Sequence, residues 1–125
     1  MNISIIIPAF NEDESVEKLA TEIISILSLK DYIYEIIFID DGSVDSTWAM
    51  ISELNKSVKS YANYDIKGIR FKKNLGKSAA LNVGFAHAQG DVIVTMDADL
   101  QDDPNEIISL YKMIQHEGYD LVSGW

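Results

Sequence analysis

The sequence predicts an α/β protein, a single domain over residues 1–125 with a mostly parallel sheet that helices cover on both faces. Apolar runs without polar alternation recur along the chain, as in parallel strands that are buried on both faces. Segments with apolar residues at helical spacing separate these runs, and regular strand–helix alternation is typical of parallel sheets with right-handed crossovers. The length of 125 residues suits one domain with one core.

Five apolar runs are expected to be strands. They cover residues 2–8, 35–39, 66–71, 91–96 and 119–122. The run over 2–8 is rich in isoleucine, which suits a strand in the middle of the sheet. The run over 66–71 is more polar than the others, so we expect it nearer to an edge.

Four amphipathic segments between these runs are expected to be helices. Their apolar stripes are Val16–Leu27, Met50–Val58, Ala80–Ala88 and Ile107–Ile114. A capping-box pattern precedes the first helix, with Asn11 as the cap and Glu14 three residues later. The segment Asp45-Ser46-Thr47 is expected to start the second helix. Gly84 predicts a close approach of the third helix to the sheet, because a glycine inside a helix otherwise costs about 1 kcal/mol.

Four aspartates lie within seven residues after the fourth predicted strand, at positions 97, 99, 102 and 103. Asp97 and Asp99 are two residues apart, so their side chains leave an extended segment on the same side. Two carboxylates about 4 Å apart repel by roughly 4 kcal/mol at an effective dielectric constant of 20, and a divalent cation removes that cost. Hard oxygen ligands suit Mg²⁺ or Mn²⁺, so we predict a metal-binding pair.

A simpler interpretation of the same cluster is helix capping. Pro104 is expected to open the last helix and Gly118 to end it. Asp102 or Asp103 then stands where an N-cap belongs. On this interpretation Asp97 and Asp99 are ordinary solvated loop residues.

The overall charge limits the classes of partner. Twenty acidic and ten basic residues give a net charge of −10. This charge argues against nucleic acid as a partner, because phosphates need a basic surface. The absence of cysteine excludes a disulfide framework and a zinc–thiolate site. No apolar run approaches the roughly 18 residues that span a bilayer, and no signal peptide is recognisable, so we expect a cytoplasmic location.

Three loops are expected to meet at one edge of the sheet. They are residues 8–12, 40–47 and 97–103, and each follows the carboxyl end of a predicted strand, where open α/β sheets bind ligands. Glu12, Asp40 and Asp41 can bind the base edge and the ribose hydroxyls of a nucleotide. A cation on the Asp97–Asp99 pair can bind its diphosphate. Taken alone, Asp-Asp-Gly is most often only a turn.

Four segments in this order carry a resemblance to a known family. They are residues 5–12, 39–47, 74–84 and 96–104. The chain resembles the family 2 inverting glycosyltransferases, which have the Rossmann-like GT-A fold. Within that family it is most similar to the polyprenyl-phosphate group, such as dolichol-phosphate mannose synthases and undecaprenyl-phosphate glucosyltransferases. The resemblance extends over essentially the whole chain and implies the nucleotide-sugar-binding half of that fold.

The resemblance implies roles for individual positions. The residues that it places around the donor nucleotide are Pro8, Ala9, Asn11, Glu12, Asp40, Asp41, Asp97 and Ala98. Asp97 and Asp99 match the Asp-x-Asp metal motif, and Gln101 would be a further ligand of Mg²⁺ or Mn²⁺. Lys77, near the start of the third helix, is either a phosphate contact or a solvated surface lysine.

The implied reaction joins a nucleoside-diphosphate sugar, UDP- or GDP-linked, to a polyprenyl-phosphate acceptor. The cation would neutralise the departing nucleoside diphosphate. In this family the catalytic base, the acceptor loop and, in the polyprenyl-phosphate group, the membrane-attaching helices come later in the chain. We therefore expect them beyond Trp125, in a full-length protein at the cytoplasmic face of the membrane. Residues 1–125 alone are expected to keep the donor site without turnover.

Three other functions compete with this one. A sugar-1-phosphate nucleotidyltransferase would carry a glycine-rich basic loop after its first strand, where this chain has the acidic segment 8–14. A receiver-like signalling domain would place its acidic pair after the first strand and a lysine after the fifth, whereas the pair here follows the second strand and no lysine follows Tyr119. A domain that binds nucleotide sugars without transferring them stays open.

Overall fold

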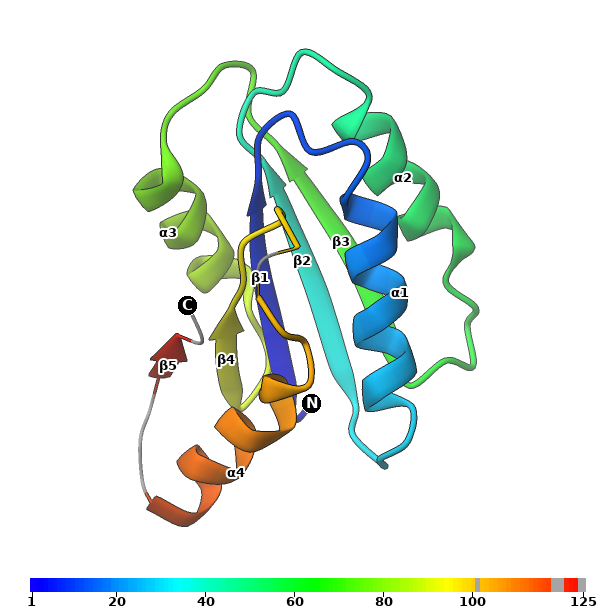
Figure 1. Cartoon of the computed structure of the whole chain (residues 1–125), viewed down its shortest axis with the longest axis vertical. Helices are drawn as coiled ribbons and strands as arrows, with labels where there is room; N and C mark the ends of the chain where they lie inside the picture. Colours follow the sequence, from blue (N-terminus) through cyan, green and yellow to red (C-terminus); the bar gives the residue numbers. More distant parts are fainter. Residues whose placement is uncertain (101, 118–120, 124–125) are drawn as a thin grey trace.

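A computed structural model describes residues 1–100, 102–117 and 121–123, and in them a five-stranded sheet with four helices (Figure 1). The strands are β1 (Ile3–Ala9), β2 (Tyr34–Asp40), β3 (Tyr64–Arg70), β4 (Val92–Thr95) and β5 (Leu121–Ser123). The helices are α1 (Val16–Leu27), α2 (Thr47–Ser57), α3 (Lys77–His87) and α4 (Glu106–Glu117). The predicted α/β class and order of elements are confirmed.

The strand order explains where a site can form. The order is β3-β2-β1-β4-β5, and every pair is parallel. The chain first moves outward from β1 through β2 to β3 and then crosses to β4 on the other side of β1. The sheet therefore has a switch point between β1 and β4, beyond whose carboxyl ends ligands bind in such folds. The more polar strand β3 lies at an edge, as its composition predicted.

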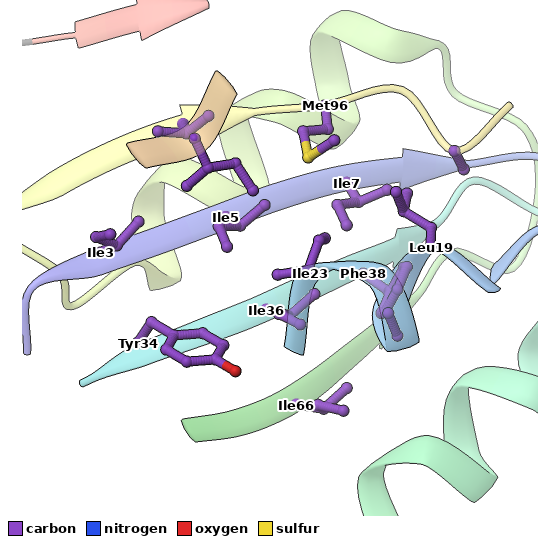
Figure 2. Packing of buried hydrophobic residues seen from close by; sticks show 14 of the residues in the cluster. Ile3, Ile5, Ile7, Leu19, Ile23, Tyr34, Ile36, Phe38, Ile66 and Met96 are labelled. Atoms are coloured by element: carbon purple, nitrogen blue, oxygen red, sulfur yellow. The ribbon is translucent and has the colours of Figure 1, made fainter. Parts of the chain in front are cut away.

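Helices cover both faces of the sheet, so β2 is buried throughout and β1 is buried except at Pro8. The larger core lies between one face of the sheet and the helices α1, α2 and α4 (Figure 2). Ile3, Ile5 and Ile7 of β1 point into it. Ile6 points to the opposite face, where it packs with Ile37, Ile39 and helix α3. This two-sided burial is why β1 and β2 are continuous apolar runs rather than alternating ones.

Gly84 lets α3 lie directly on the sheet. A Cβ at this position would come 2.4 Å from Cγ2 of Ile6, which is fully buried. The close helix–sheet approach predicted from this glycine is therefore confirmed.

A buried carboxylate fastens the end of the sheet opposite the switch point. Glu35 on β2 is fully buried, and it accepts hydrogen bonds from Ser4 Oγ (2.6 Å), Lys67 Nζ (2.6 Å) and the Gln89 N–H (2.7 Å). Burial acts to raise the pKa of Glu35, but these hydrogen bonds outweigh it and hold that pKa below the ordinary value. The carboxylate thus joins three strands to the segment that follows α3.

Two predictions about helix starts need separate treatment. The capping box at Asn11 and Glu14 is wrong, because α1 begins only at Val16. Asn11 has a positive φ of 53°, and its Oδ1 accepts the N–H of Val44 in another loop. At the other end of the chain, α4 begins at Glu106 and not at Pro104 as predicted, and Asp103 Oδ1 accepts the N–H of Asn105 in the turn that precedes this helix.

Two expected features fall on residues that the structure does not describe. Gly118, the predicted end of α4, and Tyr119, the predicted start of the last strand, both lie outside the described ranges. Among the helices of the described residues, none is long and apolar enough to cross a bilayer.

Replacing Gly84 by alanine should destabilise the protein by about 1–3 kcal/mol, because the new methyl group overlaps Ile6. In an ordinary helix interior the same change would stabilise by up to about 1 kcal/mol. Denaturant unfolding of Gly84→Ala shows whether the free energy of unfolding falls or rises. In an Ile6→Ala background the added methyl group should cost less, and equal costs in both backgrounds would contradict the contact.

Glu35→Gln should lower the free energy of unfolding at pH 7 by about 1.5–3 kcal/mol, the range for hydrogen bonds to a charged group. The folded-state pKa of Glu35 is lowered, so its contribution is present above the unfolded value of about 4.3. It is lost as the pH falls through the folded value. The difference between wild type and variant should therefore shrink in acid, as measured by urea unfolding at several pH values. Glu53→Gln on α2 is the control, and a pH-independent difference for Glu35→Gln would count against this account.

Candidate functional site

An open hollow of about 210 Å³ lies at the carboxyl edge of the sheet, beside the switch point. Its lining residues are Pro8, Ala9, Phe10, Glu12, Asp41, Lys77, Asp97, Ala98 and Asp99. The loops after β1, β2 and β4 and the start of α3 all contribute to it. The structure thus brings together most of the predicted site residues from segments that are far apart in the sequence.

The loops after β1 and β2 are joined by hydrogen bonds between side chains and backbone. The Asn11 N–H donates to Ser43 Oγ (2.8 Å), and the Val44 N–H donates to Asn11 Oδ1 (2.9 Å). The Glu12 N–H donates to Thr47 Oγ1 (2.9 Å). Asn11 is therefore a residue that fixes the two loops, and it does not line the hollow itself. Glu12 owes its place in the hollow to these contacts.

Asp41 is almost fully buried and organises the loop before α3. Its Oδ1 accepts the Leu75 N–H (2.7 Å), and its Oδ2 accepts the Gly76 N–H (3.1 Å) and Asn74 Nδ2 (3.1 Å). The neighbouring Gly42 has a φ of 76°, and a Cβ there would lie 2.3 Å from the carbonyl carbon of Lys73. The Asp-Asp-Gly turn is thus pressed against the loop that leads into α3.

Asp40 is buried away from the hollow. Its Oδ1 accepts the Ser43 N–H (2.9 Å), and its Oδ2 lies 3.9 Å from Arg70 Nε. Arg70 in turn stacks on the ring of Trp48. The geometry gives Asp40 a role in shaping the turn after β2, and it is not among the lining residues of the hollow.

The loop after β4 places two carboxylates in the hollow. Asp97 and Asp99 both line it, as expected from their spacing, and Ala98 between them is buried. Asp102 turns back and accepts the Asp97 N–H at Oδ2 (2.9 Å), whereas Asp103 accepts the Asn105 N–H in the turn before α4. Burial, with the nearby charges of Asp97 and Asp99, raises the pKa of the Asp102 carboxyl against the effect of this hydrogen bond. Asp102 thus holds the backbone of the Asp97–Asp99 pair.

Lys77 reaches across the hollow from the first residue of α3. Its Nζ lies 2.6 Å from Asp97 Oδ1. The side chains of both residues are partly exposed, 58 % for Lys77 and 37 % for Asp97. The lysine thus lines the hollow and pairs with Asp97, while much of its side chain stays exposed to solvent.

The donor set fits a hard divalent cation that shares its coordination with a ligand. Among the described residues, no group of three or more His, Cys, Asp or Glu side chains could hold a metal by itself. Two carboxylates are nevertheless what Mg²⁺ commonly takes from a protein, with substrate phosphates and water supplying the other oxygens. Asp97 and Asp99 are the residues that would hold it. Gln101, the third predicted ligand, lies outside the described residues.

Several residues of the site were not found from the sequence. Phe10 lines the hollow with a ring that is 46 % exposed. Ser43, Thr47, Asn74 and Asp102 act through hydrogen bonds that position other residues. An exposed aromatic residue between two predicted ligand contacts was a usable signal for Phe10. The positioning contacts depend on how loops meet, so the sequence carries little direct signal for them.

The fold defines an open, parallel α/β domain with a ligand-sized hollow at the switch point of its sheet, and comparison with known proteins specifies its family. The chain belongs to glycosyl transferase family 2, whose model matches residues 4–125. The GT-A, Rossmann-like fold predicted by resemblance is thereby confirmed.

Two solved structures and one curated relative illustrate the similarity. The undecaprenyl-phosphate 4-deoxy-4-formamido-L-arabinose transferase of Enterobacter sp. (strain 638) is 38 % identical over 120 residues, which is 96 % of this chain and 35 % of that protein. A mannosyltransferase of Pyrobaculum calidifontis, solved with GDP-Man and Mn²⁺, superposes with a TM-score of 0.73 at 20 % identity, covering 90 % of this chain and 32 % of its own. The glucosyl-3-phosphoglycerate synthase of Mycobacterium tuberculosis was solved with Mn²⁺, UDP and glucosyl-3-phosphoglycerate. It superposes with a TM-score of 0.68 at 25 % identity, and the match covers 92 % of this chain and 40 % of that protein. This chain spans about a third of the length of the curated relatives that it matches.

Asp41→Asn should destabilise the protein by about 1–3 kcal/mol, because an amide nitrogen would face N–H donors that now meet a carboxylate. Hydrogen exchange at the amides of Leu75 and Gly76 should accelerate, and denaturant unfolding gives the stability change. Asn74→Ala removes one donor and keeps both backbone hydrogen bonds, so its effect should be smaller. Unchanged exchange at both amides in Asp41→Asn would contradict the positioning role.

Proposed function

We propose that this chain is the donor-binding part of an inverting glycosyltransferase that uses a UDP- or GDP-linked sugar. The observation that carries the proposal is that Glu12, Asp41, Asp97 and Asp99 line one hollow at the switch point of the sheet. These residues come from three loops that are at least 29 positions apart along the chain. The family membership supports transfer of a sugar as the chemistry that this hollow serves.

Each side of the hollow suits one part of such a donor. Pro8, Ala9 and the ring of Phe10 form an apolar wall for the base. The Glu12 carboxylate can accept hydrogen bonds from ribose hydroxyls, and Asp41 lies where a base edge can reach it. Asp97 and Asp99 would hold Mg²⁺ or Mn²⁺, which neutralises charge on the departing diphosphate. Asn11 and Asp40 would act on the donor only by shaping the two loops.

The size of the hollow indicates that it receives only part of the donor. Pockets for small molecules usually enclose about 300–1,000 Å³. At about 210 Å³ this one suits a diphosphate with its adjoining sugar or ribose better than a complete nucleotide sugar. The rest of the donor would lie over the open edge of the sheet.

The acceptor is proposed to be a polyprenyl phosphate. The support is the relative named as an undecaprenyl-phosphate transferase, which is 38 % identical over almost all of this chain. In the complete protein, the acceptor hydroxyl or phosphate oxygen would attack the anomeric carbon from the face opposite the diphosphate. The catalytic base and the membrane-attaching part are proposed to belong to the portion of its relatives that this chain does not span, with the protein at the cytoplasmic face of the membrane.

The acidic lining does not favour the rival nucleotidyltransferase. A triphosphate would need basic or glycine-rich backbone close to the first loop, and Glu12 occupies that position in the hollow. Transfer from a diphosphate sugar needs only the one cation that the Asp97–Asp99 pair can hold.

Calorimetric titration with UDP, GDP and their sugars, first with Mn²⁺ and then with EDTA, tests the proposal. One nucleotide family should bind only with the cation, and Asp99→Asn should weaken that binding about tenfold or more, or at least about 1.4 kcal/mol. Asp103→Asn is the matched control, since Asp103 lies outside the hollow and an asparagine Oδ1 can also accept the Asn105 N–H. Equal affinity with and without the cation would overturn the proposed function.

A further inference from the structure

We propose that Lys77 occupies Asp97 in place of the metal until a diphosphate arrives, and thereby makes metal binding depend on the nucleotide. This inference rests on the proposed function and adds to it that the cation and the nucleotide bind interdependently. Lys77 would release Asp97 to the cation and transfer its ammonium group to the diphosphate when both ligands bind together.

The first support is the geometry of the ion pair. Lys77 Nζ lies 2.6 Å from Asp97 Oδ1, within the hollow that both residues line. A divalent cation coordinates carboxylate oxygen at about 2.0–2.1 Å when it is Mg²⁺. An ammonium group in contact with that oxygen both fills a coordination direction and repels the incoming cation. Binding of a cation to Oδ1 of Asp97 therefore competes with Lys77, whose ammonium group must leave that oxygen before the cation can take it.

The second support is the shortage of protein ligands. Within the described part of the chain, no cluster of three or more potential metal-binding side chains exists. Among the described carboxylates of the hollow, a cation that enters alone meets the Asp97–Asp99 pair, and it competes with Lys77 for one oxygen of that pair. A cation that enters with a diphosphate gains phosphate oxygens as well, and the displaced ammonium group gains an anionic partner.

The third support is that the exchange is energetically accessible. Both side chains of the pair are partly exposed, and exposed ion pairs contribute little net stability. Lysine carries a compact charge on a flexible four-carbon chain, so its ammonium group can move while the helix stays in place. The backbone of Asp97 is held in place, because Asp102 accepts its N–H. The mobile partner of the pair is therefore the lysine.

The charges around the hollow give this exchange a consequence. Among the described lining residues, Lys77 is the one cation beside the carboxylates of Glu12, Asp41, Asp97 and Asp99. A diphosphate alone meets an excess of negative charge, and a cation alone meets Lys77. The cation thus reduces the negative charge that opposes the diphosphate, and the diphosphate draws away the Lys77 ammonium group that opposes the cation. This is positive coupling between the two binding events.

The test measures the affinity for Mn²⁺ alone, by the paramagnetic resonance signal of the free ion, in wild type and in Lys77→Gln. Without nucleotide, Lys77→Gln should bind Mn²⁺ about two- to fivefold more tightly, the range that corresponds to an exposed ion pair. With Mn²⁺ present, the same variant should bind UDP or GDP, whichever the wild type binds, about threefold or more weakly, as a charge-assisted contact is lost. A role in stability alone would not produce opposite changes for the two ligands.

Two further variants serve as controls. Lys73→Gln removes an exposed lysine from the loop that precedes α3, and it should leave the affinity for Mn²⁺ alone close to that of the wild type. Lys77→Arg keeps a cation at the position and should also stay close to the wild type. If Lys77→Gln binds Mn²⁺ alone no more tightly than Lys73→Gln does, the inference is overturned while metal-dependent nucleotide binding stands. If the wild type binds nucleotide without a cation, the proposed function fails and this inference fails with it.

Discussion

Burial of β1 on both faces is the constraint on which the rest of the structure depends. Because helices cover both sides of this strand, most of its interior positions are apolar, with Ser4 as a buried polar exception, and the polar groups of the hollow gather where the strand ends. The neighbouring strands run parallel to it, so their ends meet at the same edge. The hollow with Glu12, Asp41 and Asp97 is the direct outcome of this arrangement. The same logic leaves Glu35, a buried carboxylate within a strand, dependent on three hydrogen-bond donors.

Residues in the candidate site divide into those that face the hollow and those that hold the first group in place. Asn11, Thr47 and Asp102 belong to the second group, since their polar atoms are used between loops. Asp41 belongs to both, because it lines the hollow while it accepts three N–H groups from the loop before α3. A substitution at Asp41 therefore changes the loop and the ligand contact together, and the two effects need separate measurements.

The sequence was sufficient for the strand–helix order, the edge position of β3 and the shared location of Asp97 and Asp99, because these follow from local periodicity and from parallel topology. It was insufficient to predict the hydrogen bond of Asn11 to Val44 and the buried surroundings of Asp40. Both sit in motifs that predict ligand contact, yet Asn11 binds Val44 across 33 positions and Asp40 is buried near Arg70. The predicted capping box was wrong for the same reason, because the Asn11 side chain accepts the distant Val44 N–H and does not cap α1. Which atoms of neighbouring loops meet is set by the packed sheet, and no short segment encodes it.

The position of β3 at an edge of the sheet also has a consequence for contacts between molecules. A sheet edge offers unpaired backbone N–H and C=O groups, along which a strand of another molecule can add. On β3 that edge is accompanied by Asp65, Lys67 and the half-exposed Arg70. An incoming strand would have to strip water from these charged groups before it gained backbone hydrogen bonds. The charges therefore oppose the addition of a strand along this edge of the sheet.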